Sequence, residues 1–178
     1  METTLTPEQA QERSWHAQIA RNEWVVLHEP ARRDGSSPAF QYTAGLTERG
    51  LPEVVVYGLR MKTGTLVLDD LAWRLLNGDE FADGVPIPGL VVGDDRAQLW
   101  DATWLQDHLD AVLRLYGTVA RVRQLVVADP QGLLPWEDGF SIGHLEPVLF
   151  TPPNGRGPRR TEPGAYEPAS GLYAFGDE

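Results

Sequence analysis

Apolar and polar positions alternate in several short stretches of the chain, which is the pattern of β-strands. Residues 39–46 place Tyr42 and Thr43 on opposite faces and predict a half-buried strand. The continuous apolar run over 54–57 predicts a strand that is covered on both faces. Other strands are expected at 24–28, 90–92, 98–100 and 121–128. Because they are close in sequence, the strands at 24–28 and 39–46 are expected to pair as antiparallel neighbours.

Apolar positions recur at helical spacing in three longer stretches, over residues 6–21, 65–77 and 103–116. Thr6 and Pro7 are typical of a helix start, whereas Gly78 and Gly117 stand where glycine commonly ends a helix. The elements together indicate an α+β fold, with an antiparallel-rich mixed sheet of about five to seven strands and about three packed helices.

The length of 178 residues fits one domain, which we assign to residues 1–150. From Thr151 onward the composition changes to a Pro/Gly-rich C-terminal tail, residues 151–178. This composition predicts a disordered or loosely attached segment, whose few aromatic side chains suit docking on the body or on a neighbouring molecule.

Composition and charge narrow the classes of function. The formal net charge of −11 argues against a nucleic-acid-binding protein, because neutralising phosphates requires a basic face. The chain has no cysteine, which excludes disulfides, thiolate zinc sites and a cysteine nucleophile. The four histidines show no metal-ligand spacing, so we expect no metal site and no cofactor. No apolar run has the length of a membrane span and the N-terminus is unlike a secretory signal, so we expect a cytoplasmic protein.

Two sequence blocks are distinctive when taken in this order. The first covers residues 40–48 and 51–59, where a Tyr-Thr-Ala-Gly-Leu strand end is followed by a Pro-Glu strand start. The second covers residues 122–129 and 132–136, where a Gln-bearing strand ends in Asp and is followed by Gly and Pro-Trp. Over about residues 22–150 the chain resembles the bacterial family called domain of unknown function 4262. It departs from the family pattern at 60–65 and in the tail, and the resemblance implies an α+β domain in a bacterium but no activity.

Three polar residues of the first block are candidates for a binding site. Tyr42, Thr43 and Glu53 would form a polar cluster at a strand end that grips a ligand. The alternative is structural, with the Tyr42 hydroxyl satisfied by backbone, Thr43 favoured as a strand former, and Gly45 allowing a close backbone approach. We favour the structural interpretation for this group.

The second block and the strand at 24–28 add four further candidates. A Gln on an apolar strand face needs partners, so Gln124 either contacts a ligand or ties a neighbouring loop. Asp129 belongs to a turn, Trp136 either packs as a corner or lines an apolar cleft with Tyr42, and His28 ends a strand.

Three classes of function remain open. The first is a non-enzymatic binding or interaction protein, of an accessory or immunity type, whose acidic surface meets a basic protein partner. The second is an enzyme that acts on a small molecule or peptide with polar residues at strand ends, among them Tyr42, Glu53, His28 and Asp129. The third is a self-associating structural protein. We favour the binding protein, with a basic protein or a small molecule as its partner.

Overall fold

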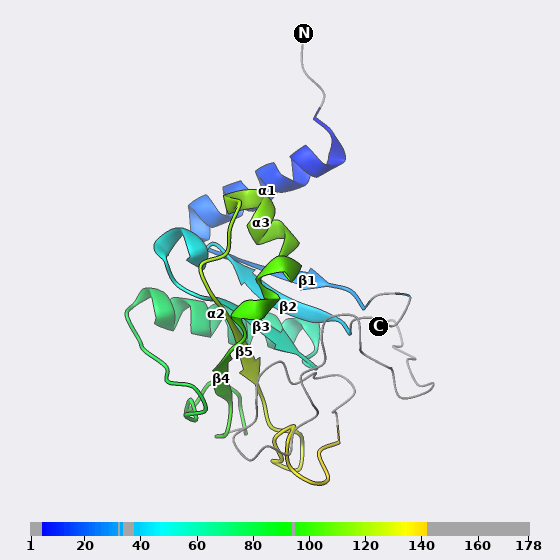
Figure 1. Cartoon of the computed structure of the whole chain (residues 1–178), viewed down its shortest axis with the longest axis vertical. Coiled ribbons are helices and arrows are strands. Elements are labelled where there is room, and N and C mark those ends of the chain that lie inside the picture. The colour runs from blue at the N-terminus through cyan, green and yellow to red at the C-terminus, as the bar shows by residue number, and fades with distance from the viewer. Residues whose placement is uncertain (1–4, 32, 34–37, 94, 142–178) are drawn as a thin grey trace.

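The computed structural model describes residues 5–31, 33, 38–93 and 95–141 of the chain (Figure 1). The expected tail, residues 151–178, lies outside them. The elements in chain order are α1 (Pro7–Asn22), β1 (Val25–Glu29), β2 (Phe40–Ala44), the 3-10 helix η1 (Leu46–Arg49), β3 (Glu53–Tyr57), α2 (Met61–Leu76), β4 (Gln98–Asp101), the 3-10 helix η2 (Thr103–His108), α3 (Asp110–Tyr116) and β5 (Val122–Val126). The fold is α+β, as predicted.

Five strands of the described residues form one mixed sheet in the order β1-β2-β3-β5-β4. Three neighbouring pairs are antiparallel, which confirms the predicted pairing of β1 with β2, and the pair β3–β5 is parallel. Parallel neighbours need a long connection between them, and here the chain passes through α2, β4 and α3. The strand number is the lower limit of the predicted range.

Helices cover both faces of the sheet, which confirms the prediction that the strand at 54–57 is buried on both faces. Val55 and Tyr57 pack in one apolar cluster with residues of α1 and α3, such as Val112. Val54 and Val56 point the other way and pack against α2. In Figure 1 α1 and α3 lie beside each other and α2 lies apart from them. The core is therefore two layers, one on each face of the sheet.

The first helix begins as its sequence predicts. Thr6 and Gln9 exchange the two hydrogen bonds of a capping box, and Pro7 occupies the first helical position. Only Ile19 is buried within α1, and Trp15 packs beside it on the α1/α3 layer. No helix in the described part of the chain is long and apolar enough to cross a membrane.

Two helices differ from their expected bounds. α2 begins at Met61, after the N-cap Arg60, so residues 61–65 belong to the helix, which was expected to begin only at residue 65. A Cβ at Gly64 would collide with the side chain of Gln41, so glycine lets the helix lie close to β2. The helix expected over 103–116 is divided into η2 and α3 at Leu109, whose ψ of 69° is not helical.

The prediction of a strand at 90–92 is wrong, because these residues form no strand of the sheet. Gly89 and Gly93 have φ angles of +69° and +80°, so the chain turns on both sides of this stretch, and Val92 is fully exposed. Instead, Pro86 forms an isolated bridge with Gln98, so the preceding segment lies along the edge strand β4.

Candidate functional site

Glu53 holds together the corner where β2 leads through η1 into β3. Its Oε1 accepts hydrogen bonds from the amides of Gly45 at 3.1 Å and Thr47 at 2.8 Å. Its Oε2 accepts from the Thr43 hydroxyl at 2.7 Å, and that hydroxyl accepts in turn from the Val54 amide at 2.9 Å. The carboxylate therefore satisfies two backbone donors that neither strand pairing nor helix pairing uses. Thr43 and Glu53 therefore form a cluster, as the sequence predicts, but in this structure their polar groups bind each other.

The Glu53 corner is an electrostatically costly place for a charge. The side chain is fully buried, and burial raises the pKa of Glu53 although the hydrogen bonds it accepts oppose this shift. The Tyr116 hydroxyl at the end of α3 is also buried, and it has no hydrogen-bond partner among the described residues. Burial, followed by the charges of Glu48 and Glu53, raises the pKa of Tyr116 to about 12.

Gly45 and Tyr42 show why the first sequence block has its composition. Gly45 has a φ of +130°, and a Cβ there would stand 2.6 Å from the carbonyl oxygen of Glu23, which confirms the predicted close backbone approach. Tyr42 lies on the other face of β2 from Thr43, fully buried, and donates its hydroxyl hydrogen bond to Oε1 of Glu29 at 3.3 Å. Burial, followed by the charge of Glu29, raises the pKa of Tyr42.

Asp129 organises the loop that follows β5. Its Oδ1 accepts from the amides of Gln131 and Leu133, both at 2.9 Å. Its Oδ2 accepts from the amide and the hydroxyl of Ser141 at 2.9 and 3.0 Å. Burial raises the pKa of Asp129, but these hydrogen bonds outweigh it and lower the pKa below its usual range. We call residues 129–141 the Asp129 loop.

The other three candidates lie in different surroundings. Trp136 is buried and contacts Trp100 edge to face, with ring centroids 5.9 Å apart, so it packs as a corner. Gln124 is fully buried in β5, between β3 and β4. His28 is exposed on the edge strand β1, opposite Gln41 of β2.

The seven predicted residues do not converge on one site. Because β3 and β5 are parallel, Glu53 at the start of β3 and Asp129 after the end of β5 lie at opposite ends of the sheet. Tyr42 and Trp136 belong to separate apolar clusters. Binding through any of these residues stays a prediction, but Glu53 already accepts three internal hydrogen bonds and Asp129 four.

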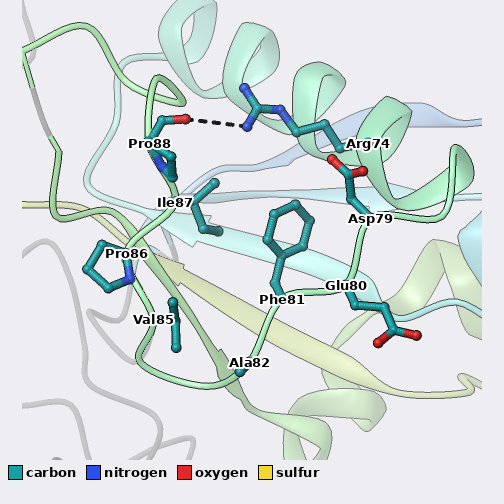
Figure 2. A pocket seen from close by; sticks show the side chains of 9 residues that line it. All are labelled: Arg74, Asp79, Glu80, Phe81, Ala82, Val85, Pro86, Ile87 and Pro88. Carbon is teal, nitrogen blue, oxygen red and sulfur yellow. Dashed lines mark hydrogen bonds between the residues drawn. The ribbon is translucent and has the colours of Figure 1, made fainter.

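A pocket of about 370 Å³ lies elsewhere, between the end of α2 and the segment 79–88 (Figure 2). Phe81 and Ile87 point toward each other at its centre. Arg74 crosses one end, donating to the Pro88 carbonyl at 3.4 Å, while its other nitrogen pairs with Asp70 at 2.7 Å.

Two acidic residues complete the lining of this pocket. Asp79 and Glu80 are exposed, with the Asp79 carboxylate on the Arg74 side and the Glu80 carboxylate turned away from Phe81 (Figure 2). Within the described part of the chain, neither carboxylate forms an ion pair. The Arg74 charge is matched by Asp70, so two uncompensated negative charges remain beside an apolar centre.

The wall of the pocket is held from β5 and β4. Arg123 of β5 donates to the Phe81 carbonyl at 2.6 Å and pairs with Asp83. Gly84 has a φ of +72°, and a Cβ there would stand 2.6 Å from the ring of Trp100. Glycine therefore lets the segment lie against β4, and the pocket is formed before any ligand arrives.

A model of the family described as Domain of unknown function (DUF4262) matches residues 18–141. The chain belongs to this family. No curated protein and no solved structure gives a significant match to the chain.

The geometry explains the composition of the two sequence blocks that resemble the DUF4262 family. The first block builds the corner between β2 and β3, where Glu53 accepts three hydrogen bonds and only glycine fits at position 45. The second builds β5, the Asp129 loop and the packed Trp136. The blocks therefore encode loop architecture at the two ends of the sheet. The pocket lies between them in sequence, within the residues that the DUF4262 model matches.

Reasoning from sequence missed the pocket, although one signal was present. Between Asp69 and Asp110 the chain carries ten acidic and two basic residues, so this stretch holds eight of the eleven net negative charges. It runs from α2 along the β4 edge of the sheet to the start of α3. Four exposed carboxylates of this stretch lie at the pocket or beside it along β4, those of Asp79, Glu80, Asp83 and Asp101, and we call them the acidic surface. A charge count by segment, rather than for the whole chain, points to it.

Proposed function

We propose that the protein is a non-enzymatic binding protein that docks a basic protein partner on the acidic surface. The observation that supports this most is the pocket in that surface, with its apolar centre and two uncompensated carboxylates. Complementary charge would steer the partner into contact and make the association salt-dependent. An accessory or immunity role in the cytoplasm of a bacterium fits such a protein, and both the role and the location are part of the proposal.

Exposed apolar side chains supply the contact area that such a docking surface needs. Leu66 and Trp73 are 62% and 58% exposed and lie two turns apart on the outer side of α2. Val85 is 53% exposed and lines the pocket. Apolar residues surrounded by charged ones are typical of protein interfaces, in which aromatic residues contribute most of the binding energy.

The test is to identify the partner by site-specific crosslinking and then to measure its binding directly. A photoreactive phenylalanine analogue replaces Trp73, and in a matched control it replaces His16 on α1, which is exposed on the other face of the sheet. We expect position 73, but not position 16, to crosslink one basic protein in the host cell. With that protein purified, calorimetry should show affinity falling about tenfold between low and moderate salt. An acidic or neutral partner, or binding that salt does not change, contradicts the proposal.

The enzyme alternative has one observation in its favour. At the Glu53 corner a buried carboxylate with a raised pKa lies near the Tyr116 hydroxyl, which has no partner in the described part of the chain, and perturbed groups of this kind occur at catalytic sites. Against it, the Glu53 carboxylate is fully buried and accepts three hydrogen bonds. A metabolite that co-purifies with the protein and shifts the NMR signals of Thr47 and Tyr116 would favour the enzyme.

A further inference from the structure

We propose that the pocket between α2 and the segment 79–88 holds an arginine side chain of the basic partner. This inference rests on the proposed function and makes it specific, because it names the group that anchors the partner. It starts from the size of the pocket. At about 370 Å³ the pocket is in the lower part of the range of ligand sites and is large enough to admit one long side chain.

The lining matches the two parts of an arginine side chain. The apolar centre formed by Phe81 and Ile87 suits the aliphatic stem, which long cationic side chains bury while the charged head stays at the edge. The guanidinium is planar and weakly hydrated, so it stacks on aromatic rings such as Phe81 and forms paired hydrogen bonds with carboxylates. Asp79 and Glu80 are the carboxylates within this lining.

An anionic ligand fits the same pocket poorly. Arg74 is the one cation among the lining residues, and it is already engaged by Asp70 at 2.7 Å and by the Pro88 carbonyl at 3.4 Å. An anion would have to displace Asp70 and would also meet Asp79 and Glu80. A cation meets the Asp79 carboxylate on the Arg74 side, and Glu80 can turn toward it from the rim, so the charge balance of the pocket favours arginine over a carboxylate.

The backbone of the pocket needs little rearrangement to receive its ligand, and the exposed side chain of Glu80 is the part that turns. Arg123 fixes the wall at Phe81 and Asp83, and Gly84 seats the segment against Trp100. A preformed site avoids the entropic cost of ordering a loop upon binding.

The direct test is a titration of the labelled full-length protein with Nα-acetyl-arginine methylamide at constant ionic strength. We expect saturable changes in the NMR signals of Asp79–Pro88 with a Kd on the order of 1–10 mM. The neutral isostere Nα-acetyl-citrulline methylamide should bind about threefold to tenfold more weakly. Equal binding of the citrulline probe, no saturable shift at these residues, or preferential binding of Nα-acetyl-glutamate methylamide each overturns the inference.

Variants distinguish binding in the pocket from a general attraction of the arginine probe to the acidic protein. The double variant Asp79→Asn/Glu80→Gln should weaken arginine binding at least about threefold, whereas Glu8→Gln on α1 should leave it unchanged. Phe81→Leu keeps an apolar side chain but removes the ring, and should also weaken binding of the arginine probe. If these variants bind the probe as the wild type does, the inference is wrong.

The two proposals can fail separately. If the crosslinked basic partner binds in a salt-dependent way while the arginine probe leaves the pocket signals unchanged, the anchor site is wrong and the binding function stands. If the probe binds at the pocket but position 73 crosslinks no basic protein, the pocket recognises guanidinium groups from another source and the proposed function is wrong.

Discussion

Glu53 and Asp129 each gather the polar hydrogens of a tight loop onto one carboxylate, at opposite ends of the same sheet. Their electrostatic settings differ. Glu53 is fully buried and its pKa is raised, whereas Asp129 is 5% exposed and its pKa is lowered. Burial outweighs three accepted hydrogen bonds at Glu53, whereas four accepted hydrogen bonds outweigh burial at Asp129, so the balance of the two decides which form of the acid the fold favours. The Glu53 corner joins two central strands of the core, and the Asp129 loop lies beyond the end of one strand.

The largest effect is expected when each carboxylate is removed. Glu53→Ala leaves two buried amides and the Thr43 hydroxyl without their acceptor, which should cost about 3–5 kcal/mol in the free energy of unfolding. Asp129→Ala should cost less, because the hydrogen bonds to Asp129 are part-buried, whereas those from Thr43 and Gly45 to Glu53 are fully buried. Urea denaturation measures both, and Glu48→Ala at an exposed position of η1 serves as the control with little effect. A larger loss of stability for Asp129→Ala would show that the Asp129 loop, and not the Glu53 corner, contributes more to the free energy of unfolding.

Glycine-to-alanine substitutions compare the steric demands of the Glu53 corner and the Asp129 loop. Gly45→Ala places a methyl group 2.6 Å from the Glu23 carbonyl oxygen at a φ of +130°, and should cost about 2–4 kcal/mol. Gly132→Ala in the Asp129 loop has a φ of +80° but nothing within 4 Å of the new methyl group, and should cost about 1 kcal/mol. Thermal denaturation of the two variants checks the order. Equal losses would show that backbone strain, and not the close approach at Glu23, dominates at Gly45.

The contrast also shows what the sequence can and cannot predict. Local periodicity and closeness in sequence predict the antiparallel pairing of β1 with β2 and the burial of both faces of β3. The structure confirms both predictions. The residues at 90–92 have the apolar pattern of a strand, but glycines with positive φ at 89 and 93 turn the chain there. Local pattern also does not reveal that Leu109 divides a helix.

The candidate site was harder to predict for a different reason. The chemistry of Glu53 and Asp129 suggests reactivity, but only the three-dimensional arrangement shows that hydrogen bonds within their own loops engage them. The pocket combines Arg74 of a helix with a loop that Arg123 positions from a distant strand. No spacing rule joins those residues, and the acidic excess over 69–110 is the one signal of the pocket in the sequence.

The smallest effect, and the sharpest contrast, lies in the pH dependence of stability. A carboxyl whose pKa is raised by folding stabilises the protein most below its unfolded pKa of about 4.3, and that contribution is lost as the pH rises through the folded pKa. Glu53 belongs to this class. A carboxyl whose pKa is lowered stabilises above its unfolded pKa of about 3.9, and that contribution is lost as the pH falls through the folded pKa. Asp129 belongs to this second class.

Glu53→Gln and Asp129→Asn remove the two titrations, so each is compared with the wild type by urea denaturation from about pH 3 to pH 8. The stability difference between the wild type and Glu53→Gln should shrink as the pH rises above about 4. The difference for Asp129→Asn should instead grow as the pH rises toward about 4 and then stay constant. Each substitution also alters hydrogen bonding, which shifts the stability difference by a constant amount. That shift does not change how the difference varies with pH. If both differences grow with pH, the hydrogen bonds at the Glu53 corner outweigh its burial, and the two carboxylates are electrostatically alike after all.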